Sequence, residues 1–338
     1  MRKEILIAIV LGIFVGIIVA FGVWRANTAF KGNASKSVQV SQNENEDASD
    51  PQTLNITVAN PENYDVLVSS PVTASGIATQ GTWVVISSET EDFITQTNGT
   101  GAFEQNIEPV GGINQLIFAA FNEEGQGVRQ ALTIVFSTEF ANEIITDAQE
   151  ESDEEEDEAD AVRERVEARL QESRLNPKAA LGAVTDKTED ALQIRNVLGE
   201  IKLISINPEL TSFVSINGST AEVNFDDVAI GDFIVAMGFS NGNGVLDARR
   251  VLLTGAPEAP SREIIFGEVL STQGRAATIR TPNNGEVAID FPTRWKGPEV
   301  DELYEGTKVI AVLVEDEGDR FVRTIEIVSS QPPPSSEE

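Results

Sequence analysis

An apolar run of twenty residues, Ile5–Trp24, constrains this chain most, because it contains no charged side chain. As an α-helix rising about 1.5 Å per residue, it would be roughly 30 Å long and match the hydrocarbon core of a bilayer. We therefore predict that residues 1–30 form a cytoplasmic tip and a transmembrane anchor. The tail before the run is only a few residues long, so we expect a single-pass protein whose carboxyl-terminal bulk is extracytoplasmic.

A cleaved signal peptide is the alternative interpretation of this run. Such a peptide has a shorter apolar core and an A-x-A-like cleavage site. The nearest candidate site, Ala26-Asn27-Thr28-Ala29, fits that pattern poorly. The chain has no cysteine, so a lipid cannot be attached through a thioether. An uncleaved anchor is the expectation, with cleavage left open.

Four small residues, spaced four apart, lie on one face of the predicted membrane helix: Ala8, Gly12, Gly16 and Ala20. This small-xxx-small pattern lets two helix backbones approach closely, so we predict a candidate transmembrane dimer face and a weak homodimer. Glycine and alanine are also common in membrane helices, and a chance pattern is the alternative.

Composition excludes several classes of function. The net charge of −31 argues against nucleic acid and against anionic membrane surfaces as partners. With no cysteine and no histidine, the chain has no disulfide, no thiol nucleophile, no ordinary zinc site and no serine–histidine–acid triad. We therefore predict a protein that is not an enzyme and holds no metal or cofactor. A glycosidase that uses a carboxylate pair stays formally open, because it needs neither residue type.

Residues 31–53 are polar and predict a flexible stalk. Between residues 54 and 138 about seven short apolar or alternating runs are separated by turn residues, which is typical of a β-sandwich. Five features of this segment resemble the bacterial Ig-like domains related to domain B of glucodextranase: Pro61, the expected strand Val72–Gly76, Gly101-Ala102-Phe103, Gly112–Leu116 and Ala119–Gly125. That resemblance implies a spacer or adhesive module. The motif glycines also suit turns, and Phe103 and Leu116 suit a core.

Residues 139–178 are predicted to be an acidic linker followed by an exposed charged helix. Asp153–Glu158 is an unbroken run of acids, and Ala159, Val162, Val166 and Leu170 are spaced as one helical face. We interpret this helix as a semi-rigid strut between domains. A short coiled coil is the alternative. The segment lacks the D-x-[DN]-x-[DN]-G pattern of a calcium loop.

The last part of the chain contains an internal repeat, with copies at residues 179–255 and 264–330 and a linker at 256–263. Gly182-Ala183-Val184 matches Gly267-Glu268-Val269, and the segment beginning at Ile230 matches the one beginning at Glu305. Five or six strands of this length predict two small antiparallel β-barrels, each closed on itself. Whether the barrels pack together or swing about the linker stays open. Residues 331–338 are predicted to be a disordered tail.

The repeat resembles a bacterial barrel family known only as a domain of unknown function. The first copy matches its motifs at Ile230-Gly231-Asp232 and at Asn243–Val251. The second copy is divergent, with Thr307 in place of the expected aspartate and Thr324 in place of alanine. Gly231-Asp232 is interpreted as a turn before a strand, not as a catalytic acid.

Arg294, Trp295 and Lys296 form the candidate ligand platform, because an aromatic ring between two cations, bracketed by prolines, suits a sugar. The alternative is a tryptophan that folds back and plugs the mouth of the barrel. We therefore expect a mostly β, membrane-anchored bacterial surface protein with an adhesion, scaffolding or interaction role and an envelope protein or glycan as partner. An accessory carbohydrate-binding protein that uses the Trp295 loop is the alternative function.

Overall fold

The computed structural model describes residues 54–142, 176–216, 220–241, 243–283, 285–316 and 318–329, which all belong to one compact unit. This part of the chain is mostly β, as predicted. Among the described residues, no helix has the length and apolar composition needed to cross a bilayer. The predicted span Ile5–Trp24, the stalk, the acidic run with its helix, and the tail lie outside the described residues.

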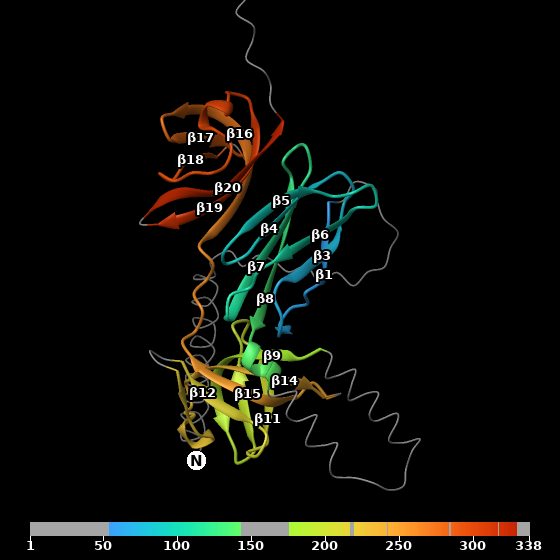
Figure 1. Cartoon of the computed structure of the whole chain (residues 1–338), viewed down its shortest axis with the longest axis vertical. Coiled ribbons are helices and arrows are strands. Elements are labelled where there is room, and N and C mark those ends of the chain that lie inside the picture. The colour runs from blue at the N-terminus through green and yellow to red at the C-terminus, as the bar shows by residue number, and fades with distance from the viewer. Residues whose placement is uncertain are drawn as a thin grey trace, which may run out of the picture. The chain divides into compact units, whose positions relative to one another are not determined.

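The first module, the sandwich module, consists of two sheets that pack face to face (Figure 1). One sheet has the order β1-β3-β6 and the other β2-β8-β7-β4-β5. Alternate residues of both sheets, among them Phe103, Leu116 and Phe118, form the shared core. The strands are β1 Ile56–Asn60, β2 Val66–Leu67, β3 Val72–Ala78, β4 Trp83–Ser87, β5 Asp92–Gln96, β6 Ala102–Ile107, β7 Gly112–Phe121 and β8 Gly127–Phe136.

The first repeat follows, and its sheet has the order β11-β10-β9-β14-β15-β12-β13. A parallel pairing of β11 with β15 joins five of these strands into a ring. β12 pairs with the same edge of β15 further along the strand, and β13 pairs with β12. Its elements are β9 Lys178–Lys187, β10 Ala191–Arg195, β11 Ile201–Ile206, β12 Ser212–Ser215, β13 Ala221–Glu222, the 3-10 helix η1 Phe225–Asp227, β14 Phe233–Ser240 and β15 Leu246–Thr254.

The second repeat is a closed barrel with the order β16-β17-β18-β20-β19. Its ring also closes through a parallel contact, here between β18 and β20. The two repeats therefore have the same strand order, that of a five-stranded Greek-key barrel. The elements are β16 Arg262–Gln273, β17 Ala276–Arg280, β18 Glu286–Asp290, the 3-10 helix η2 Val300–Glu302, β19 Lys308–Asp316 and β20 Asp319–Ser329.

The repeated glycines serve this geometry. A Cβ at Gly182 would lie 2.3 Å from the carbonyl oxygen of Arg195, and one at Gly267 would lie 2.5 Å from that of Arg280. The neighbouring strand therefore approaches so closely that no side chain fits at either position. Gly231, at φ +101°, turns the chain before β14, and the Asp232 carboxylate accepts a hydrogen bond from the Ala229 amide within that turn.

Both barrels pack against the sandwich module with equivalent faces. On the outer side of the first barrel, Leu181 and Val235 are paired in register on β9 and β14 and contact Val66 and Phe140 of the sandwich module. Residues 138–142 are helical, so the chain continues past the predicted boundary at 138 into a turn whose Phe140 is fully buried.

The second barrel repeats this arrangement on β16 and β19, where Phe266 and Ile310 are paired in register. These two residues pack against Val85, Ala119 and Phe121 of the large sandwich sheet, and the Phe121 and Phe266 rings stack at 5.9 Å. The large sheet is therefore covered on both faces. Each barrel is fixed to the sandwich module by buried apolar contacts.

Candidate functional site

The Trp295 loop connects β18 to η2 at one end of the second barrel. Trp295 is half-buried, and its ring packs edge-to-face against the ring of fully buried Phe291 with the two ring centroids 5.2 Å apart. Its indole N–H donates to the Pro298 carbonyl at 2.7 Å. The ring thus folds back onto the barrel core. Arg294 and Lys296, on either side, are exposed.

A cleft of about 680 Å³ opens beside this loop. One wall is the β4–β5 hairpin of the sandwich module, residues 90–92, and the other is formed by the Trp295 loop and residues 321–325 of β20. The cleft, called the Trp295 cleft below, brings together all three residues of the predicted platform. It also adds residues that sequence reasoning did not connect with them, above all Asp92 and Arg323.

An ion pair across the module boundary lies in the wall of the Trp295 cleft. The Arg323 Nε atom lies 3.0 Å from Asp92 Oδ2, and the Asp92 side chain is only 2% exposed. The Ser87 hydroxyl donates to the other carboxylate oxygen of Asp92 at 2.6 Å. Burial raises the pKa of Asp92, against the opposing effects of Ser87 and Arg323, because a desolvated carboxylate favours its neutral form.

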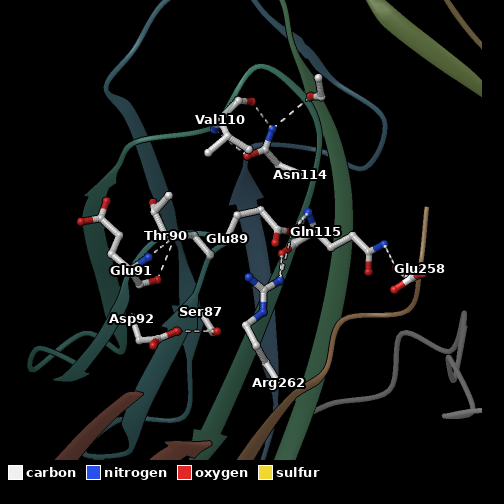
Figure 2. A network of polar contacts seen from close by, with 12 residues as sticks. Ser87, Glu89, Thr90, Glu91, Asp92, Val110, Asn114, Gln115, Glu258 and Arg262 are labelled. Atoms are coloured by element: carbon white, nitrogen blue, oxygen red, sulfur yellow. Dashed lines mark hydrogen bonds and ion pairs between the residues drawn. The ribbon is translucent and has the colours of Figure 1, made fainter. Parts of the chain in front are cut away.

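Arg262 makes a second polar connection across the same boundary (Figure 2). Its guanidinium is almost completely buried, lies 3.3 Å from the Glu89 carboxylate and donates to the Gln115 carbonyl. Burial lowers the pKa of Arg262, and Glu89 opposes this shift by stabilising the charged form. Figure 2 also shows Gln115 donating to the Glu258 carbonyl, which ties the linker between the barrels to the sandwich module.

Sequence reasoning did not predict that the second barrel packs against the large sandwich sheet, although the sequence carries a signal for it. The runs Trp83–Ile86 and Phe118–Phe121 are apolar at every position, not at alternate ones. Such continuous runs indicate strands that are buried on both faces. They do not identify which other module provides the second cover.

A larger cleft of about 860 Å³ lies on the first barrel between β12, β13 and η1. Phe213 and Phe225 line it with their rings 5.6 Å apart, and Arg250 lies at its margin. It contains no residue of the predicted platform. Across the described ranges, no group of three or more acidic side chains is arranged to hold a metal ion. The predicted dimer face, Ala8, Gly12, Gly16 and Ala20, lies outside those ranges.

No family model matches the chain, and no curated protein matches it. Among solved structures, the chain is similar to "drosophila Unr CSD456" at 12% identity and a TM-score of 0.18, covering 82% of this chain and 100% of that one. It is also similar to a 1.5-MDa bacterial ice-binding adhesin studied for host cell surface retention, at 11% identity and a TM-score of 0.19, covering 81% and 97%. TM-scores this low carry no argument about fold or function.

Proposed function

We propose that this protein is a single-pass, membrane-anchored bacterial surface protein with a non-enzymatic adhesion, scaffolding or interaction role. One observation supports this proposal above the others: the sandwich module holds both barrels by equivalent apolar faces. A preassembled body presents its remaining surfaces in fixed relative positions. Binding then costs less ordering entropy than it would for modules on free linkers.

The sequence supports the remaining parts of the proposal. The apolar run Ile5–Trp24 has the length of a membrane span, and the resemblance of residues 54–138 to bacterial Ig-like domains implies a spacer or adhesive unit. The barrel family that the two repeats resemble is known only as a domain of unknown function, so the resemblance implies no chemistry for either barrel. An interaction role is therefore the simplest function for the assembly.

Protease treatment of intact cells, followed by mass spectrometry of released and retained peptides, tests the proposal. We expect peptides from residues 54–330 in the released fraction and the anchor in the membrane pellet. In a control, a cytoplasmic protein of the same cells stays intact while a known surface protein is cleaved. Complete protection of residues 54–330 under those conditions would contradict surface display.

The Trp295 cleft favours a second candidate function, accessory carbohydrate binding. The observation is the size of the cleft, about 680 Å³, together with the exposed cations Arg294 and Lys296 at its rim. The expected result is glycan-array binding by the full chain in detergent that is lost when both cations are replaced by alanine. Replacing Arg275 and Arg280, which do not line the cleft, is the matched control. Equal loss in both variants, or no glycan binding, would contradict this candidate.

A further inference from the structure

The charge inside the Trp295 cleft differs from that of the chain as a whole, which carries −31. The charged residues that line the cleft are the cations Arg294, Lys296 and Arg323 and the acids Glu91 and Asp92. A cube of the cleft's volume would have an edge of about 9 Å, close to the Debye length of about 8 Å at physiological salt. The lining charges therefore act on a ligand in the cleft much more strongly than the distant acids of the chain do.

Both acids of the cleft lining are engaged within the protein. The Asp92 carboxylate pairs with Arg323 and accepts a hydrogen bond from Ser87, which Figure 2 shows. One oxygen of the Glu91 carboxylate accepts a hydrogen bond from the Glu108 amide at 3.0 Å. The charges of Asp92 and Arg323 offset each other, so the remaining charges of the lining are two cations and one acid.

Arg294 and Lys296 are exposed and form no hydrogen bond or ion pair with the residues that the structure describes. Several other cations of the described ranges are used inside the protein: Lys178 and Arg320 form ion pairs, and Lys308 donates to a backbone carbonyl. The acids of η2, which follow the Trp295 loop, do not line the cleft. Two cations on either side of one indole are thus available to a ligand.

Hydrogen bonds inside the Trp295 loop fix the base from which these cations project. The Trp295 amide donates to the Pro292 carbonyl at 3.1 Å, and the indole N–H donates to the Pro298 carbonyl at 2.7 Å. A Cβ at Gly297 would collide with the indole, so the chain passes close to the ring there. Binding to a loop that is already ordered costs less conformational entropy than binding to a loop that orders with its ligand.

We infer that the Trp295 cleft binds an anionic glycan, with the carboxylate or phosphate group of a sugar placed between Arg294 and Lys296; the inference rests on the candidate carbohydrate function. Arginine holds either group by two parallel hydrogen bonds, and hydrogen bonds between charged groups are about twice as strong as neutral ones. Half-buried Trp295 and Phe321 line the cleft and give apolar surface for the sugar ring. A neutral sugar would gain the apolar contacts but not the charged ones.

Paired glycans on an array test the inference, because the two members of each pair differ in charge. The pairs are oligogalacturonate with its methyl ester and phosphorylated oligomannose with its dephosphorylated form, offered to the full chain in a non-ionic detergent. We expect at least one charged probe to bind at least about tenfold more tightly than its neutral partner. A rise in ionic strength from about 0.05 to about 0.5 M should weaken that binding at least about threefold. The charged probe that binds identifies the anion as a carboxylate or a phosphate.

Arg294→Gln combined with Lys296→Gln should reduce the binding of the charged probe to that of its neutral partner. Arg275→Gln combined with Arg280→Gln makes the same change in net charge on the same barrel, outside the cleft, and should leave binding unchanged. Equal loss in both variants would overturn the inference, since net charge and not the cleft would then govern binding.

The remaining outcomes separate the inference from the candidate function on which it rests. Equal binding of charged and neutral probes, or binding of neutral glycans alone, would overturn the inference and leave carbohydrate binding in place. Poly(glycerol phosphate), an anion without a sugar ring, should bind more weakly than the best charged probe. Equal binding of this polymer would also overturn the inference, because the cleft would then recognise charge without a sugar. No binding to any member of the array, neutral glycans included, would overturn the carbohydrate function and the inference together.

Discussion

Replacing Arg323 by methionine should weaken the attachment of the second barrel in a pH-dependent manner. The substitution keeps most of the side-chain volume but leaves the Asp92 carboxylate, 2% exposed, without its ion-pair partner. Removing one partner of a buried pair typically costs about 3–5 kcal/mol. Since Arg323 is itself 20% exposed, we expect a loss of about 2–3 kcal/mol at neutral pH.

The sign of the pH dependence follows from the raised pKa of Asp92. A carboxyl group with a raised folded-state pKa favours the folded state below its unfolded value, 3.8, and this contribution is lost as the pH rises through the folded value. Without Arg323, the pKa of Asp92 rises further. The deficit of the variant should therefore be small at low pH, about 1 kcal/mol for the lost hydrogen bond to the Ser88 carbonyl, and should grow towards neutral pH.

Urea unfolding of the full chain in detergent, followed by tryptophan fluorescence between pH 4.5 and 8, measures this deficit. Trp83 and Trp295 lie on the two sides of the boundary and report on it. A double-mutant cycle with Asp92→Asn isolates the pairwise energy. Arg320→Met removes an exposed pair with Glu263 and is the control, with an expected effect below about 1 kcal/mol at every pH. A deficit that is equal at both ends of the pH range would refute the reasoning.

Three further predictions use the same unfolding assay. Gly182→Ala should destabilise the first barrel by about 1–3 kcal/mol, because its Cβ would lie 2.3 Å from a backbone oxygen, whereas Gly111→Ala, with open space at the Cβ position, should have little effect. Phe266→Ala should cost about 3–5 kcal/mol by opening a cavity against Phe121, and a smaller loss would mean that the barrel is not held there. Lys178→Met should remove a stabilising contribution that is constant between pH 6 and 9. Burial lowers the pKa of Lys178, but hydrogen bonds to Asp65 and Glu62 raise it more, so the stabilisation persists until the pH exceeds the raised value. A loss of stability that varies with pH within that range would contradict this prediction.

The mostly β content could be predicted from the sequence because strand periodicity and turn residues are local signals. The repeat was visible for the same reason, since Gly182 and Gly267 answer the same steric requirement in both copies. The role of that requirement was not visible, because the atom that excludes a Cβ belongs to a residue 13 positions away in each copy, Arg195 and Arg280.

The surroundings of Trp295 could be predicted only in part. Its neighbouring cations and prolines are adjacent in the sequence, so a platform could be proposed from them. The other wall of the cleft comes from residues 90–92, about two hundred positions earlier in the chain. No periodicity links such distant segments, because their contact depends on how one folded module docks on another.

The docking faces explain why the two copies could diverge elsewhere. Both copies keep apolar residues on the outer side of their first and fourth strands, Leu181 and Val235 in one and Phe266 and Ile310 in the other. Exposing either face would cost about 25 cal/mol for each Å² of apolar surface returned to water, so a polar substitution there would release a barrel. Positions outside these faces carry no such constraint, and exposed Ile230 of the first copy is matched by exposed Glu305 in the second, so a substitution at either position should leave the attachment of the barrels to the sandwich module unchanged.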